Sequence, residues 1–150
     1  MAQFKIKRFN ELSTAELYEL LRLRSEVFVV EQNCVYQDID NKDQKAIHVL
    51  GYLNQELIAC SRVFAPGDYF EFASIGRVIV AQKQRANSFG HELMNVSIQA
   101  VVQHFNTTNI TISAQEYLKK FYESHGFIQT SKPYLEDGIP HIEMKKTTPR

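Results

Sequence analysis

The stretch from Ile75 to Met94, IGRVIVAQKQRANSFGHELM, decides the fold of this chain. It begins with β-branched apolar residues, which predict a strand, and continues into a polar, basic turn. A helical pattern then starts, because Phe89, Leu93 and Val96 are spaced to share one helix face. A strand, a turn and a helix N-terminus in that order place unpaired N–H groups and a positive dipole end at one point. Such a point suits phosphate, although an ordinary β-to-α connection has the same outline.

The composition predicts one soluble domain over residues 1–150. The 150 residues are 44% hydrophobic, which is enough to bury a substantial core. With 17 basic and 17 acidic residues the net charge is +0, which argues against a nucleic-acid binder. Cys34 and Cys60 lack the spacing of a metal motif or a disulfide framework, so we expect a cytoplasmic protein without a metal. No signal-peptide core is visible, and no apolar run reaches membrane-spanning length.

The residues before the opening stretch predict a strand at 4–7, a helix and a hairpin. Ser13-Thr14-Ala15-Glu16 is a capping box that starts the helix, whose period ends near residues 27–30. The hairpin is predicted from two apolar runs on either side of Asn54-Gln55-Glu56. Between helix and hairpin lies a loop with Asp38, Asp40 and Asp43. It lacks the Gly and the final Glu of a calcium loop, so we expect a solvated acidic loop near a substrate entrance.

The residues after the stretch alternate between strands and helices. We expect the central helix to end near Phe105, a strand over 110–114 and a short helix over 116–125 that ends at Gly126. A strand over 127–130, a loop over 132–140 and a last strand over 141–145 follow. The order β-α-β-β-β-α-β-α-β-β predicts an α/β (α+β) fold, a mixed sheet with helices on both faces.

In this order, the chain resembles the GNAT family of acyl-CoA-dependent N-acyltransferases, and within it the ElaA-type branch. The segments that carry the resemblance are Val27-Phe28-Val29-Val30-Glu31-Gln32 with Cys34 and Tyr36, His48, Ile75-Gly76-Arg77-Val78, Ala114-Gln115, Phe121-Tyr122 with Gly126-Phe127, and Tyr134 with Glu136-Asp137-Gly138-Ile139-Pro140-His141 and Met144. The resemblance covers nearly the whole chain. It implies a mostly antiparallel sheet, an acetyl-CoA cosubstrate and an amine acceptor, with no nucleic acid or membrane as partner.

The family's phosphate turn reads Arg/Gln-x-x-Gly-x-Gly/Ala. In this chain Arg85 and Gly90 fit, whereas Ser88 replaces the first glycine, where a Cβ restricts close approach of the backbone to pyrophosphate. By resemblance, two groups of residues bind the cosubstrate. The strand residues beside the pantetheine arm are Val78, Ile79 and Val80, with Gln115 from another strand, and the Val80 N–H is the expected donor to the thioester oxygen. The residues around the pyrophosphate are Arg85, Ala86, Asn87, Ser88, Phe89, Gly90 and His91, the His91 side chain facing solvent.

Tyr122 matches the family's tyrosine that protonates the departing CoA thiolate. A tyrosine has a pKa of about 10, so it is a proton donor at neutral pH. The alternative is a core tyrosine on an amphipathic helix. The surrounding Phe121-Tyr122-x-x-x-Gly126-Phe127 pattern favours the catalytic role.

Four residues could act as the general base or bind the acceptor: Glu31, His48, Glu71 and His141. His141 follows Gly138-Ile139-Pro140 at a strand entrance and is the better functional candidate, whereas His48 in a strand fits a structural role. Arg77 is predicted either to face the acceptor or to form a structural ion pair.

The predicted function is transfer of an acetyl group from acetyl-CoA to a primary amine by direct attack in a ternary complex. Neither cysteine has a recognisable nucleophile setting, so no acyl-enzyme is expected. The alternatives are a catalytically silent acyl-CoA-binding module and an interaction protein that keeps only the fold. A homodimer that pairs through the last strands is a further expectation, because edge strands favour pairing.

Overall fold

The computed structural model describes residues 2–147. Its helices are α1 (Thr14–Arg24), the π-helix η2 (Ser25–Glu31), α2 (Phe89–Phe105) and α3 (Lys119–Glu123), with 3-10 turns η1 (Phe9–Glu11), η3 (Asp43–Lys45), η4 (Gln82–Asn87) and η5 (Glu116–Leu118). Its strands are β1 (Gln3–Arg8), β2 (Ile47–Leu53), β3 (Glu56–Phe64), β4 (Ala73–Val80), β5 (Ile110–Gln115), β6 (Ile128–Gln129), β7 (Tyr134–Glu136) and β8 (Ile139–Lys146).

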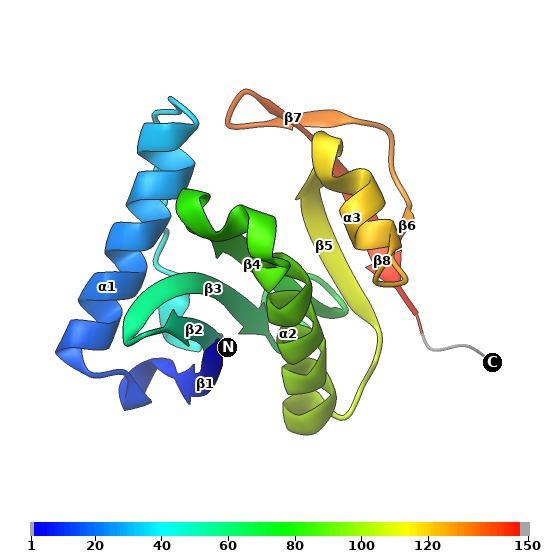
Figure 1. Ribbon diagram of the computed structural model, residues 1–150. Coiled ribbons are helices and arrows are strands. Elements are labelled where there is room, and N and C mark those ends of the chain that lie inside the picture. Colours follow the sequence, from blue (N-terminus) through cyan, green and yellow to red (C-terminus); the bar gives the residue numbers. More distant parts are fainter. Residues whose placement is uncertain (1, 148–150) are drawn as a thin grey trace.

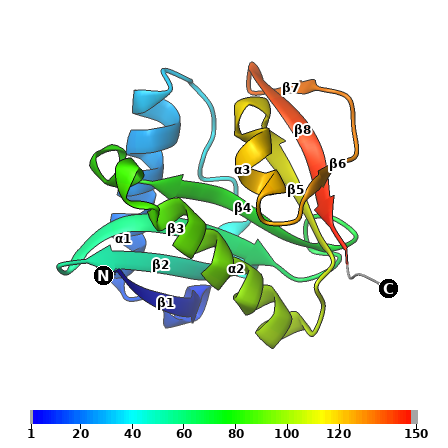
Figure 2. The same cartoon turned by 45° about the vertical axis from the view of Figure 1, so that its right-hand side comes forward.

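All eight strands form one sheet in the order β1-β2-β3-β4-β5-β8-β6, with β7 also paired to β8. Every pairing is antiparallel except that between β4 and β5. Helix α1 covers one face, and α2 and α3 cover the other (Figures 1 and 2). The predicted mixed, mostly antiparallel sheet with helices on both faces is therefore confirmed.

The two parallel strands separate soon after they meet. Ala73 lies opposite Ile110 and Ser74 opposite Thr111, after which β4 and β5 diverge (Figure 2). Backbone groups beyond the divergence face a gap instead of a neighbouring strand. This gap positions the candidate site.

Local sequence explains where several elements begin and end. The Ser13 hydroxyl accepts a hydrogen bond from the Glu16 N–H at 3.0 Å, and Glu16 accepts one from the Ser13 N–H at 2.8 Å, which confirms the capping box. Asn54 and Gln55 have φ of 51° and 67°, as a two-residue hairpin turn requires. Gly126 ends the segment after α3 with φ of 91°, which confirms its left-handed conformation.

Three predicted segments differ from the structure. The helix does not stop where its 3.6-residue period ends but continues as the π-helix η2. The helix over 116–125 is instead the turn η5 followed by the short α3. The predicted loop over 132–140 contains β7, whose positive-φ residues Asp137 and Gly138 form a tight turn into β8.

The prediction of a solvated acidic loop is wrong. Asp38 and Asp43 are buried, and both contact Arg24 of α1: Arg24 Nε lies 3.0 Å from Asp38 Oδ2, and Nη1 lies 2.7 Å from Asp43 Oδ1. Arg62 of β3 approaches Asp40 at 2.6 Å and Asp43 at 3.1 Å. Buried charges need such partners, because an unpaired charge in the interior is very costly. The aspartates thus anchor the loop to the face of the sheet that α1 covers.

Candidate functional site

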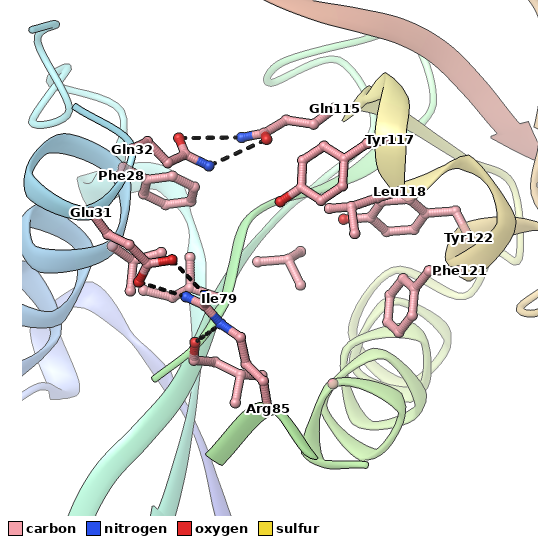
Figure 3. Close-up of a pocket in the computed structure, with 14 residues that line it drawn as sticks. Phe28, Glu31, Gln32, Ile79, Arg85, Gln115, Tyr117, Leu118, Phe121 and Tyr122 are labelled. Atoms are coloured by element: carbon pink, nitrogen blue, oxygen red, sulfur yellow. Dashed lines mark hydrogen bonds and ion pairs between the residues drawn. The ribbon is translucent and has the colours of Figure 1, made fainter. Parts of the chain in front are cut away.

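A cavity of about 360 Å³ opens between β4, the start of α2 and α3. We call it the β4–α2 cavity (Figure 3). Its lining residues are Val27, Phe28, Glu31, Gln32, Val78, Ile79, Val80, Arg85, Gly90, Gln115, Tyr117, Leu118, Phe121 and Tyr122. A volume of this size fits a ligand pocket.

The last residue of β4 presents its backbone to this cavity. The Ala81 N–H donates to Ile58 O of β3 at 2.7 Å, so the neighbouring polar groups of Val80 point to the opposite edge, into the gap. Arg85 Nε donates to Val80 O at 3.1 Å from that side. Val78 and Val80 are half-buried and line the cavity, whereas Ile79 between them is buried in the core. An extended ligand could pair with this edge as a strand would.

The start of α2 forms the second wall. Ser88 is the N-cap residue, with φ of 62° and ψ of 14°, and its side chain makes no capping hydrogen bond. A serine therefore holds the left-handed conformation that glycine adopts most readily. Gly90 lines the cavity, whereas Phe89 is buried and the predicted Ala86, Asn87 and Ser88 lie exposed on the adjoining turn. The first N–H groups of α2 have no partner within the helix and carry its positive dipole end, which suits an anion.

The guanidinium of Arg85 lies across the cavity mouth. It contacts the Glu31 carboxylate with both terminal nitrogens, Nη2 to Oε1 at 2.8 Å (Figure 3). Glu31 belongs to η2, so this pair joins η2 to the turn before α2. The predicted phosphate-binding arginine and the predicted acceptor-binding glutamate are thus partners in the same ion pair.

Tyr122 projects from α3 into the cavity (Figure 3). It is 7% exposed, and burial raises the pKa of its phenol well above the ordinary value. The hydroxyl consequently stays protonated at neutral pH and can only lose its proton to a strong base. The neighbouring Phe121 stacks against the exposed His91, whose Nδ1 lies 2.9 Å from His125 Nε2.

Gln32 and Gln115 bridge the far end of the cavity. Their side-chain amides exchange two hydrogen bonds, Gln32 Nε2 to Gln115 Oε1 at 3.2 Å and Gln115 Nε2 to Gln32 Oε1 at 3.4 Å (Figure 3). Gln115 was predicted as a contact for the cosubstrate, whereas no motif singled out Gln32. The bridge closes the cavity toward two smaller ones.

The two smaller cavities lie on the other side of this bridge. The His141 pocket has a volume of about 80 Å³ and is lined by Arg77, Ser113, Gln115, Tyr122, Glu136 and His141, among others. The Cys34 pocket has about 50 Å³ and shares Arg77, Gln115, Glu136 and His141, with Cys34 and Asp137 at its edge. Tyr122 lines both the β4–α2 cavity and the His141 pocket. It therefore stands where the two meet.

Arg77 forms the structural ion pair that was one of its two predicted roles, and it also lines the two small pockets. It lines both small pockets, and its Nε lies 2.8 Å from Asp38 Oδ1 while Nη2 donates to Asp38 O at 3.1 Å. Its guanidinium also lies 5.5 Å from the ring centre of Tyr36. The positive charge of Arg77 is thus neutralised by the aspartates of the anchored loop, although its side chain lines the pockets.

The structure separates the four candidate bases. His48 is buried, lines none of the three cavities and places Nε2 2.9 Å from Asp43 O; burial lowers its pKa, which fits a neutral structural histidine. Glu71 is exposed in the turn before β4 and lines none of the cavities described above. Glu31 is paired with Arg85. Of these four residues, only His141 lines the two small pockets, and its role as a base stays a prediction.

Sequence reasoning gave no site role to several residues of these pockets: Phe28, Gln32, Tyr36, Ser113 and Leu118. Most of them lie in segments that the family resemblance already marked, but no residue pattern assigned them a role. The place of Ser113 in the His141 pocket depends on the pairing of β5 with β8, in which Ser113 lies opposite Glu143.

Residues 2–147 contain neither a metal-binding group of side chains nor a helix that could span a membrane. No three histidine, cysteine, aspartate or glutamate side chains in that range converge in a metal-binding arrangement. No helix in that range is both long and apolar enough to cross a membrane.

Comparison with known proteins places this geometry in a family. The profile of the acetyltransferase (GNAT) domain matches residues 11–148. The chain is 43% identical over 148 residues to protein ElaA of Escherichia coli, covering 97% of each. The crystal structure of Escherichia coli ElaA superposes with a TM-score of 0.91 at 42% identity, covering 97% of this chain and 99% of that one. An acyl-CoA N-acyltransferase from Pseudomonas aeruginosa superposes with a TM-score of 0.93 at 36% identity, covering 98% and 100%. The chain belongs to the GNAT acetyltransferase family.

Proposed function

We propose that this protein transfers an acetyl group from acetyl-CoA to a primary amine, by direct attack within a ternary complex. One observation carries the proposal: a large cavity with strand-edge and helix-N-terminal donors meets a small polar pocket at a single buried tyrosine, Tyr122. A thioester in the first cavity would reach an amine in the second at that point.

The β4–α2 cavity fits acetyl-CoA in three respects. Its β4 edge offers the Val80 backbone to the amides of a pantetheine arm. The N-terminus of α2 offers N–H groups and a positive dipole end to the pyrophosphate. The apolar lining from Val27, Phe28 and Leu118 would surround the thioester end and exclude water.

The proposed step conserves protons and electron pairs. The amine lone pair attacks the thioester carbon, forming a C–N bond, and the carbonyl electrons move to oxygen, where the Val80 N–H stabilises them. When this intermediate collapses, the C–S bond breaks and the sulfur takes the electron pair. The nitrogen passes a proton to solvent, the thiolate takes one from the Tyr122 hydroxyl, and the phenolate left behind regains a proton from solvent, which leaves an amide and a thiol.

Thermal unfolding with and without acetyl-CoA tests the cosubstrate. A ligand at 100 times its dissociation constant raises the free energy of unfolding by roughly 2.7 kcal/mol, so a clear rise in melting temperature is expected. No rise at millimolar acetyl-CoA would refute the proposal.

Thiol release across a panel of primary amines tests turnover, and Tyr122→Phe tests the acid. General acid–base groups contribute about 10²–10⁴-fold to a rate, so this variant should release thiol at least about 100-fold more slowly. Its stabilisation by acetyl-CoA should be unchanged. Tyr18→Phe is the matched control, since Tyr18 lies exposed on α1. An unchanged rate in Tyr122→Phe would remove this residue from the mechanism.

A catalytically silent acyl-CoA-binding protein is the second candidate function. The observation that favours it is Ser88, a Cβ-bearing residue with φ of 62° where the family's turn has glycine. Stabilisation by acetyl-CoA without thiol release for any amine would support this second function against the first.

A further inference from the structure

The side chains of Glu136 and His141 form a pair in the wall of the two small pockets. They lie on the adjacent strands β7 and β8, and His141 Nε2 is 3.3 Å from Glu136 Oε2. The His141 side chain is 9% exposed, whereas that of Glu136 is 41% exposed. One partner is thus held in the pocket wall, and the other can be reached from outside.

The tautomer of His141 follows from its second contact. Nδ1 lies 2.7 Å from Ile139 O. A carbonyl oxygen can only accept, so Nδ1 carries a proton, and in the neutral ring Nε2 carries a lone pair. That lone pair faces a carboxylate oxygen, and two acceptors face each other without a donor between them. The gap between Nε2 and Oε2 is therefore a place for one proton.

A chain of hydrogen-bond donors meets the other carboxylate oxygen of Glu136. Ser113 Oγ donates to Glu136 Oε1 at 3.1 Å, so the Tyr134 hydroxyl, 2.6 Å from Ser113 Oγ, donates to that serine. Tyr134 also stacks on the His141 ring, with ring centres 6.2 Å apart. Oε2 is left free to face His141 and the pocket.

The charge around the pair favours a cation. The charged and titratable groups that face it across the small pockets are Cys34, Tyr36, Arg77, Tyr122, Tyr134 and Asp137. The one cation among them, Arg77, is already paired with Asp38 and Asp40. Glu136 and Asp137 therefore leave the pocket mouth net negative.

We infer that the Glu136–His141 pair binds the ammonium group of a primary alkylamine and accepts its proton, with His141 as the general base. This inference rests on the proposed function. The ammonium donates to Nε2 and Oε2, one proton passes to Nε2, and the freed lone pair attacks the thioester carbon. The proton stays between Nε2 and Oε2 until it leaves to solvent, because the carboxylate stabilises the imidazolium.

The volume of the pocket limits what enters it. The His141 pocket, of about 80 Å³, is much smaller than the β4–α2 cavity of about 360 Å³, so it takes the amine-bearing end of the acceptor. The remainder of the acceptor would extend past Cys34 and Asp137 to the outside. The substrate class is a primary amine at the end of an unbranched carbon chain.

His141→Asn tests the base while it keeps the Nδ1-like donor to Ile139 O. Butylamine, a cation at neutral pH, and O-propylhydroxylamine, an uncharged molecule of nearly the same shape, serve as probes. We expect thiol release with butylamine to fall at least about 100-fold, and the loss with O-propylhydroxylamine to be at least tenfold smaller. Glu136→Gln should also lower thiol release with both probes, but by smaller factors than His141→Asn. His104→Asn, an exposed histidine at the end of α2, should change neither.

Three results would overturn the inference. Equal losses with both probes would show that His141 only supports the pocket. Nitrogen-15 NMR can identify the His141 signal because that signal is absent from His141→Asn. A proton on Nε2 of the neutral His141 ring in the wild-type protein would contradict the inference. Wild-type protein that acetyl-CoA stabilises but that turns over neither probe would exclude this acceptor class. Absence of stabilisation by acetyl-CoA would instead count against the proposed function itself.

Discussion

The β4–α2 cavity and the His141 pocket lie side by side, but the chain builds them differently. The first combines one continuous segment, β4 through the start of α2, which offers backbone groups, with side chains from η2, η5 and α3. The second takes side chains from β4, β5, α3, β7 and β8. A backbone site depends on local conformation, whereas a side-chain site depends on how distant segments are anchored. The two should therefore respond to different substitutions.

The largest effect is expected where the anchor of the acceptor side is removed. Arg24 is 1% exposed and contacts Asp38 and Asp43, so Arg24→Met leaves two buried carboxylates without their main partner. Breaking a buried pair in this way costs about 3–5 kcal/mol of the free energy of unfolding. Urea unfolding at pH 7 measures it. Arg22→Met is the matched control two residues earlier, where an exposed pair with Glu26 contributes at most about 1 kcal/mol.

Acid provides a second measurement of the same anchor. Burial would raise the pKa of Asp43, but the hydrogen bond from Arg24 and the charges of Arg24 and Arg62 hold it below the ordinary value. Because the folded pKa is depressed, its stabilisation is complete above about pH 4 and is lost as the pH falls through the folded value. The difference in unfolding free energy between wild type and Arg24→Met should shrink in acid. A constant difference down to pH 2 would contradict this account.

The same contrast explains what the sequence could predict. Strand, turn and helix between Ile75 and Met94 are local patterns, and the predicted location of the phosphate-type site needed no long-range contact. The capping box at Ser13 and the left-handed Gly126 are local in the same way. Each of these predictions concerned residues that determine their own conformation.

The surroundings of the His141 pocket could not be predicted by that reasoning. Asp38, Asp40 and Asp43 look solvated in sequence because their partners Arg24 and Arg62 come from other elements, up to 22 residues away. The loop over 132–140 has too short an apolar run for a strand, and β7 forms only because β8 lies beside it. Glu136 gains its role from that pairing, which sets it against His141 and Ser113.

A smaller effect is expected at the Glu31–Arg85 ion pair, which joins η2 to the turn before α2 at the mouth of the β4–α2 cavity. Glu31→Gln removes the charge that holds Arg85 across the mouth of the β4–α2 cavity. Both side chains are partly exposed, so the free energy of unfolding should change by less than about 1 kcal/mol. Arg85 is then free to meet the pyrophosphate, and calorimetric titration should show CoA binding up to about fivefold tighter. Glu26→Gln breaks the exposed pair with Arg22 and is the control. Weaker binding in Glu31→Gln would show that this carboxylate helps to hold the cosubstrate.

The smallest effect is expected at Ser88, where backbone conformation alone is changed. A left-handed conformation costs a residue with a Cβ roughly 1–2 kcal/mol, and glycine loses about 0.5–1 kcal/mol more entropy on folding, so Ser88→Gly should gain about 0.5–1 kcal/mol of unfolding free energy. Ala86→Gly is the matched control in the same turn: its φ is not positive, so glycine there should only destabilise, by a similar amount. Chemical denaturation of the two variants measures this contrast. CoA should also bind Ser88→Gly more tightly, since the amides before α2 can then approach pyrophosphate without a Cβ in the way. Equal destabilisation by both substitutions would mean that the left-handed conformation of Ser88 costs the protein no stability.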